Sequence, residues 1–239
     1  LLLTRILSIQ YWSYFASMII SLAMLGFAAS GTALFLANRK GRGSERHLPW
    51  MTVLFVVSLP IGPKLAQMID CMPLMVLWDR SQLANFGGYY LLLCLPLFFG
   101  GYIIGHYFMA RQVPPGHVYF ANMLGSGAGV LLALLLLVDI HPAYALSIAV
   151  VPVAAAAWPV LKRGSHRLFL IAALLLAGMS ALLVSGHPSI SQYKGMSDLM
   201  LMPDTETEYA DWNQFGYLTV LDSKTIRYAP GLSLAYAGT

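Results

Sequence analysis

Long apolar stretches recur along this chain, and they constrain its fold more than any other feature. A membrane-spanning helix needs about 20 consecutive, mainly apolar residues. Only 10% of the residues are charged and 58% are hydrophobic, whereas soluble domains carry about 25% charged residues. We therefore predict an all-α membrane helix bundle of about six to seven spans. The spans are expected at residues 1–9 (the last turns of a first helix), 11–37, 50–70, 86–110, 118–138, 142–161 and 168–186.

The chain changes character at residue 187, where a mixed, more polar segment begins. Tyr217–Asp222 alternates apolar and polar residues as a strand does, and Thr225–Tyr228 is a candidate return strand. The sequence therefore predicts a transmembrane helix bundle at 1–186, followed by a short soluble segment at 187–239 that contains a β-hairpin. We expect no strand before about residue 210, because an open sheet leaves unpaired backbone groups in hydrocarbon.

The charges predict the orientation of this bundle in a membrane. Residues up to Gly186 include eleven Lys and Arg against four Asp and Glu, whereas the remainder has three basic and six acidic residues. Eight of the eleven basic residues lie in alternate connections, at 38–48, 111–117 and 162–167. Basic loops stay in the cytoplasm, so we expect a bacterial inner-membrane protein with residue 187 onward outside the cytoplasm. The lipid bilayer is the expected partner, and no basic patch indicates nucleic-acid binding.

Prolines and small residues predict local features of the spans. Pro60 and Pro63 flank Gly62 and predict an irregular middle in the third span. Glycine allows close backbone approach, so the small-residue runs at Gly26–Gly31 and Gly125–Gly129 should be buried against other helices.

Lys64 and Asp70 are the candidate ionisable residues inside the membrane. A charge at membrane depth costs about 2.5–3.5 kcal/mol on insertion scales, so Lys64 is a functional candidate by default, with Asp70 as its possible partner. The alternative is that Lys64 lies near a helix end and extends its ammonium group to the interface.

His106 and His117 are candidate haem ligands, because they fall at similar depth on consecutive spans and a membrane haem is held by two facing histidines. The alternative is that both are ordinary interfacial residues. Neither the two cysteines, Cys71 and Cys94, nor any other cluster indicates a metal site. We find no catalytic constellation.

Three groups of residues resemble multi-pass membrane proteins with a spermidine-synthase-like domain fused behind their helices. The first two are Leu3–Ser8 and Tyr119–Gly129, and the third combines Gln192–Ser197, Phe215–Val220 and Ala229–Tyr236. The third group resembles the family's linker from the membrane helices into the synthase domain. This chain has Phe215-Gly216 where soluble spermidine synthases carry Tyr-Gln, and Asn122 where the family favours Asp.

The resemblance implies that residues 210–239 belong to the small β-region that precedes a nucleotide-binding domain. That downstream domain would bring the glycine-rich loop and acidic residues for decarboxylated S-adenosylmethionine, so this chain itself would hold no cofactor. We expect an excerpt of a longer protein, and aminopropyl transfer follows from the resemblance alone. The alternatives are a non-catalytic subunit that packs against other membrane subunits, and a transporter or channel.

Overall fold

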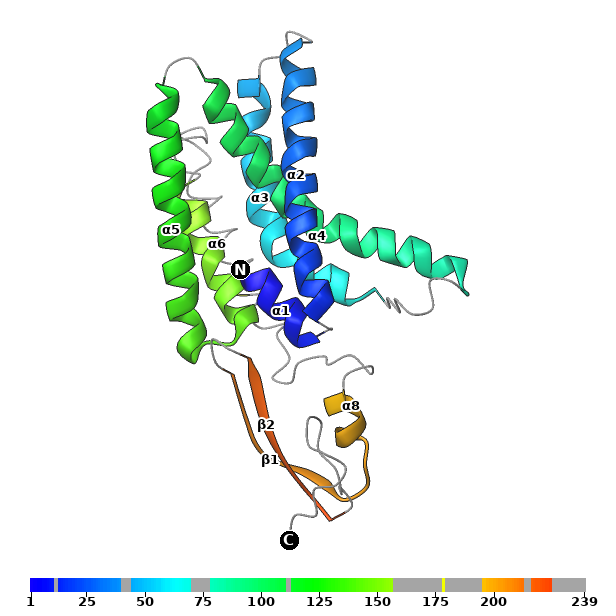
Figure 1. Cartoon of the computed structure of the whole chain (residues 1–239). Helices are drawn as coiled ribbons and strands as arrows, with labels where there is room; N and C mark the ends of the chain where they lie inside the picture. The colour runs from blue at the N-terminus through cyan, green and yellow to red at the C-terminus, as the bar shows by residue number, and fades with distance from the viewer. Residues whose placement is uncertain are drawn as a thin grey trace.

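The structure, a computed structural model, is a mainly helical body followed by two antiparallel strands (Figure 1). It describes residues 1–10, 13–39, 44–69, 78–110, 113–156, 178, 195–212 and 216–224. The helices are α1 (Leu2–Gln10), α2 (Ser13–Arg39), α3 (Ser44–Gln67), α4 (Arg80–Met109), α5 (Pro115–Asp139), α6 (Pro142–Ala156) and α8 (Gly195–Met200), and the strands are β1 (Thr205–Trp212) and β2 (Tyr217–Ser223). The predicted fold class is confirmed at this level.

Among the described residues, four helices are long and apolar enough to cross a membrane: α2, α3, α4 and α5. The described parts of α1 and α6 have 9 and 15 residues, fewer than the roughly 20 that a span needs. The predicted seventh span at 168–186 lies outside the described residues, except for Gly178. The total of six to seven spans therefore stays a prediction.

Small residues bring α2 and α4 together. A Cβ atom added to Gly26 would lie 3.0 Å from both Leu97 Cβ and the backbone nitrogen of Phe98. One added to Gly101 would lie 2.6 Å from the Oγ atom of Ser30, which is buried. Backbones this close require small side chains at the crossing. The predicted burial of small residues in α2 is confirmed for Gly26 and Ser30, whereas Gly31 has no neighbouring atom within 4 Å of such a Cβ.

The third span is a continuous helix, which corrects the expected irregular segment. α3 includes Pro60 and Pro63 without interruption. A proline removes one backbone N–H, and neighbouring helices make this tolerable. Pro96 of α4 likewise cannot donate to the carbonyl of Leu92, four residues earlier. A Cβ atom added to Gly62 would lie 2.8 Å from the Leu92 carbonyl oxygen. The absence of a side chain at Gly62 therefore allows α3 to approach the backbone of α4.

α4 begins at Arg80, six residues earlier than the predicted start of this span at residue 86. Asp79 caps it: one carboxylate oxygen accepts the Ser81 backbone N–H at 2.9 Å, and the other accepts the Ser81 hydroxyl at 2.6 Å. The hydroxyl and then the amide of Ser81 lower the pKa of the Asp79 carboxyl. At 30 residues α4 is about 45 Å long, and it bends partway along its length (Figure 1).

β1 and β2 form an antiparallel hairpin in which Thr205 pairs with Ser223 and Trp212 with Tyr217. The predicted strand at Tyr217–Asp222 is confirmed, but its partner is the preceding segment. β1 begins before residue 210, contrary to expectation, because Thr and Tyr favour strands and pairing with β2 satisfies its backbone. The predicted return strand at Thr225–Tyr228 lies outside the described residues.

The helix ends group in a way that matches the charge pattern. The end of α2 and the start of α3 lie at the same end of the bundle as the end of α4 and the start of α5 (Figure 1). The helix ends that flank the basic connections at 38–48 and 111–117 therefore lie at one end of the bundle. β1 contacts α5, and the hairpin lies beyond the opposite end, where α5 ends and α6 begins (Figure 1).

Candidate functional site

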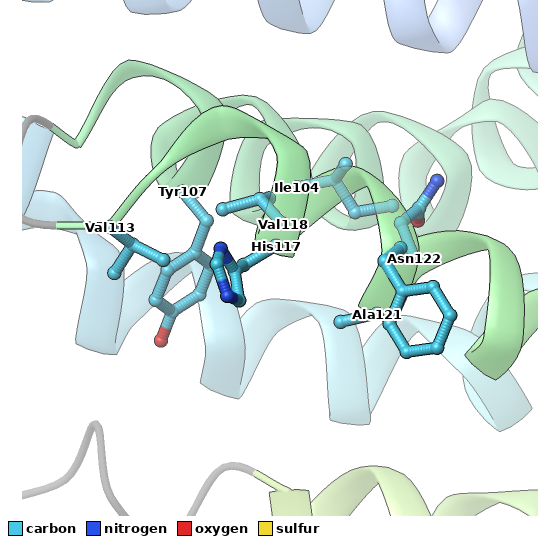
Figure 2. A pocket seen from close by; sticks show the side chains of 8 residues that line it. Ile104, Tyr107, Val113, His117, Val118, Ala121 and Asn122 are labelled. Atoms are coloured by element: carbon cyan, nitrogen blue, oxygen red, sulfur yellow. The ribbon is translucent and has the colours of Figure 1, made fainter.

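A pocket of about 580 Å³ lies between the last turns of α4 and the first turns of α5. This volume falls within the range of small-molecule sites, roughly 300–1,000 Å³. Its apolar lining comes from Ile104, Val113, Val118, Phe120 and Ala121, and its polar lining from Tyr107, His117 and Asn122 (Figure 2). Val113 belongs to the connection between the two helices, so the pocket sits at the end of the bundle that carries the basic connections.

The local sequence explains why these side chains meet. Residues three or four apart lie on one face of a helix, which places Ile104 and Tyr107 together on α4, and His117 and Ala121 together on α5. Pro115 occupies the first turn of α5, where its missing N–H is not needed and its fixed φ angle favours the helix. α4 thus ends at Met109 and α5 starts at Pro115 within a few residues, and the two faces line the pocket.

The polar groups of the pocket are neutral hydrogen-bonding groups and one imidazole. Figure 2 shows the Tyr107 phenol and the His117 ring projecting into the same part of the pocket, with Asn122 toward its other end. The described residues that line it include no Lys, Arg, Asp or Glu. Tyr107 is 37% exposed and Phe120 67% exposed, so the pocket is open on one side. It can hold an apolar molecule that carries a hydrogen-bonding group.

The two candidate haem ligands lie on neighbouring helices but in different environments. His106 is buried in α4, with its ring edge-to-face to that of Tyr107 at 5.5 Å between centroids. His117 is exposed and lines the pocket, and the α4 ring beside it is that of Tyr107. Haem binding by His106 and His117 stays a prediction. No group of three or more His, Cys, Asp or Glu in the described part of the chain could hold a metal ion.

Lys64 lies in the last turn of α3 and is half-buried. Asp70, its suggested partner, lies outside the described residues, so their pairing stays a prediction. A position at a helix end is one from which a lysine ammonium can reach the membrane interface.

No sequence pattern pointed directly to the pocket, because Tyr107 and Phe120 resemble many other aromatic residues of the spans. One indirect signal is present. Pro114 and Pro115 separate two apolar helices, and each helix carries an aromatic residue near this junction, Tyr107 before it and Phe120 after it. In the sequence, Asn122 stands out only as a departure from a family motif.

No protein-family model matches the chain, and no curated protein or solved structure is found to be similar to it. The resemblance to spermidine-synthase-like membrane proteins therefore rests on the sequence motifs alone.

Proposed function

We propose that the chain is the membrane-embedded region of a spermidine-synthase-like protein, in which any catalysis belongs to a downstream domain. The observation that supports this proposal is the β-hairpin that follows the helices. The resemblance implies a small β-region at residues 210–239, and the hairpin strands occupy Thr205–Trp212 and Tyr217–Ser223. The hairpin therefore overlaps the segment in which the family's β-region is expected.

In this proposal the helix bundle anchors the soluble part at one membrane face. β1 contacts both α5 and the short helix α8, and Leu199 of α8 is buried. A two-stranded hairpin is marginally stable in water on its own. Further strands or a domain packed on its edges would stabilise it, which is the role that the downstream domain would have.

The experiment has two stages, beginning with the coding sequence beyond Thr239. We expect a glycine-rich nucleotide-binding loop with a following acidic residue. The complete protein, purified in detergent, should then transfer the aminopropyl group of decarboxylated S-adenosylmethionine to a diamine, as followed by mass spectrometry of the polyamines. A stop codon soon after Thr239, or a complete protein without this transfer, would count against the proposal.

A second candidate function is a non-catalytic subunit of a larger membrane complex, and the exposure of α5 favours it. A Cβ added to Gly125, Gly127 or Gly129 would have no neighbouring atom within 4 Å in the described structure. The predicted burial of this small-residue run is therefore not found within the described part of the chain. Leu131 and Leu135 on the same helix are 64% and 71% exposed. A helix of another subunit could approach this surface closely.

Cysteine labelling separates the two candidates. Gly127→Cys should react with a membrane-permeant maleimide in the purified chain, and a partner subunit should protect it in native membranes. Leu91→Cys on α4, a site that is 63% exposed, is the matched control and should react in both preparations. Equal labelling of Gly127→Cys in both would contradict the subunit proposal.

A further inference from the structure

The pocket between α4 and α5 combines aromatic rings with neutral hydrogen-bonding groups. Tyr107, His117 and Phe120 supply three rings. The phenol, the imidazole and the Asn122 amide can each donate a hydrogen bond. A flat ring with hydrogen-bond acceptors at its edge complements this lining, because aromatic rings favour stacked or edge-to-face contacts with other rings.

The location of the pocket favours a ligand that arrives through the bilayer. α4 and α5 both have the length and composition of membrane spans, and the pocket lies in their adjoining turns. The large side chains along the surface of α5 are exposed, including Phe120 at 67% and Leu124 at 62%. An apolar tail could therefore continue from the pocket along α5 without leaving an apolar environment.

We propose that this pocket binds an uncharged, lipid-soluble ring compound with carbonyl acceptors, of the quinone class. His117 and Tyr107 donate hydrogen bonds to a ring carbonyl, and Asn122 serves the other end of the pocket. The ring packs against Phe120, and the isoprenoid tail leaves over Val118 and Leu124. This assignment concerns binding alone, and it does not depend on the proposed function.

The uncharged groups of the described lining suit an uncharged ligand. A phospholipid phosphate or a fatty-acid carboxylate needs a cationic partner when it leaves water, and an unpaired charge is costly to bury. The described lining offers no Lys or Arg for such an anion, and no Asp or Glu for a polyamine cation. A neutral carbonyl needs only a donor, and this pocket has three.

The test is photolabelling of the full chain in lipid nanodiscs with a short-tailed azido-benzoquinone, followed by peptide mapping. We expect labelling between Ile104 and Asn122. An excess of unlabelled decyl-benzoquinone should suppress it, and an excess of phosphatidylglycerol should not. Labelling spread along the exposed surface of α5, or suppression by phosphatidylglycerol, would overturn the proposal; the second result would indicate a phospholipid site.

Variants locate the binding to this pocket. Ala121→Trp fills it and should raise the Kd for decyl-benzoquinone by about tenfold or more. His117→Ala removes one hydrogen-bond donor. It should raise the Kd about three- to tenfold, which is the effect expected from the loss of one typical hydrogen bond. Leu131→Trp introduces the same side chain on an exposed part of α5 outside the pocket, and it should bind as the unmodified chain does.

The exposed position of His117 keeps the test usable if Ala121→Trp fails to fold. Circular dichroism and size-exclusion chromatography of each variant establish folding. A folded Ala121→Trp variant with unchanged affinity would overturn the proposal. So would an effect of Leu131→Trp as large as that of Ala121→Trp.

Discussion

Glycines that look alike in the sequence have very different surroundings in the bundle. A Cβ on Gly105 would lie 2.6 Å from Leu34 Cδ1, the end of a flexible side chain, whereas one on Gly62 would lie 2.8 Å from the backbone oxygen of Leu92. A side chain can rotate away, but a backbone carbonyl in a packed helix cannot. Gly62 is therefore a position at which an added methyl group forces two helices apart.

We expect Gly62→Ala to lower the free energy of unfolding by about 1–3 kcal/mol, the usual cost of overpacking. Gly31→Ala is the matched control, because no atom lies within 4 Å of its added Cβ. That variant should be neutral or up to about 1 kcal/mol more stable, since alanine favours helix over glycine. Unfolding in mixed detergent micelles measures both. Equal stability of the two variants would show that Gly62 is not a close contact.

His141 lies between α5 and α6, with its ring edge-to-face to that of Tyr144 at 5.8 Å between centroids. Burial lowers the pKa of this histidine, because leaving water disfavours the charged form. A folded-state pKa below the unfolded value means that the neutral form stabilises the fold. That contribution is complete above the unfolded pKa of about 6.5 and is lost as the pH falls below it.

Acidification should therefore loosen the start of α6. We expect faster hydrogen exchange of the first-turn amides of α6 at pH 5.5 than at pH 7.5, after correction for the intrinsic rates. His141→Gln cannot take up a proton in this range, so it should remove the difference between the two pH values. A His141→Gln variant that kept the full pH effect would assign it to another group.

At the scale of whole elements, the bend of α4 determines what this helix can contact. In its first half, Tyr89 and Leu93 join a buried cluster with Leu7 of α1, Ile19 and Leu22 of α2, and Ala66 of α3. Its second half runs beside α2 toward the pocket (Figure 1). Pro96 lies inside the helix, and proline is the usual cause of a sharp bend.

Pro96→Ala should straighten α4, because residue 96 could then donate to the Leu92 carbonyl. Spin labels at Leu83 and Phe108 report the change through their separation by pulsed electron resonance. A straight helix places these positions about 37 Å apart, and we expect a shorter separation in the unmodified chain that lengthens toward this value in the variant. Leu91→Ala, which is an exposed substitution without a backbone effect, should leave it unchanged. An unaltered distance in Pro96→Ala would mean that packing alone holds the bend.

The whole molecule has two unlike ends. The helix ends that flank the basic connections at 38–48 and 111–117 share one end, and the hairpin lies beyond the other (Figure 1). The third basic connection, at 162–167, lies outside the described residues. From the positive-inside rule we predict that the basic end faces the cytoplasm and that the hairpin lies on the outer side.

Reporter fusions after Gly186 test this orientation. Alkaline phosphatase fused there should be active, because it folds outside the cytoplasm, and green fluorescent protein exported unfolded should be dark. A fusion in the connection at 38–48 is the control and should show the reverse. Fluorescent protein that is bright after Gly186 would place the hairpin in the cytoplasm and would overturn this prediction.

Local properties of the sequence predicted the class of the fold. Hydrophobic length alone indicates a membrane helix, and the strand-like pattern at Tyr217–Asp222 indicates a strand, because both patterns depend on neighbouring residues in the chain. The boundaries were less accurate: the capping signal of Asp79 and Ser81 moves the start of α4 to Arg80, and Pro60 does not interrupt α3.

The sequence by itself determined that this chain forms apolar helices followed by a strand, since length, composition and period suffice for that. Only the tertiary structure decided that Gly26 is buried while Gly127 is exposed, that β2 pairs with β1, and that Tyr107 joins His117 in one pocket. These features depend on which elements become neighbours in space. Burial and contact are properties of two surfaces, and each segment of sequence describes only one of them.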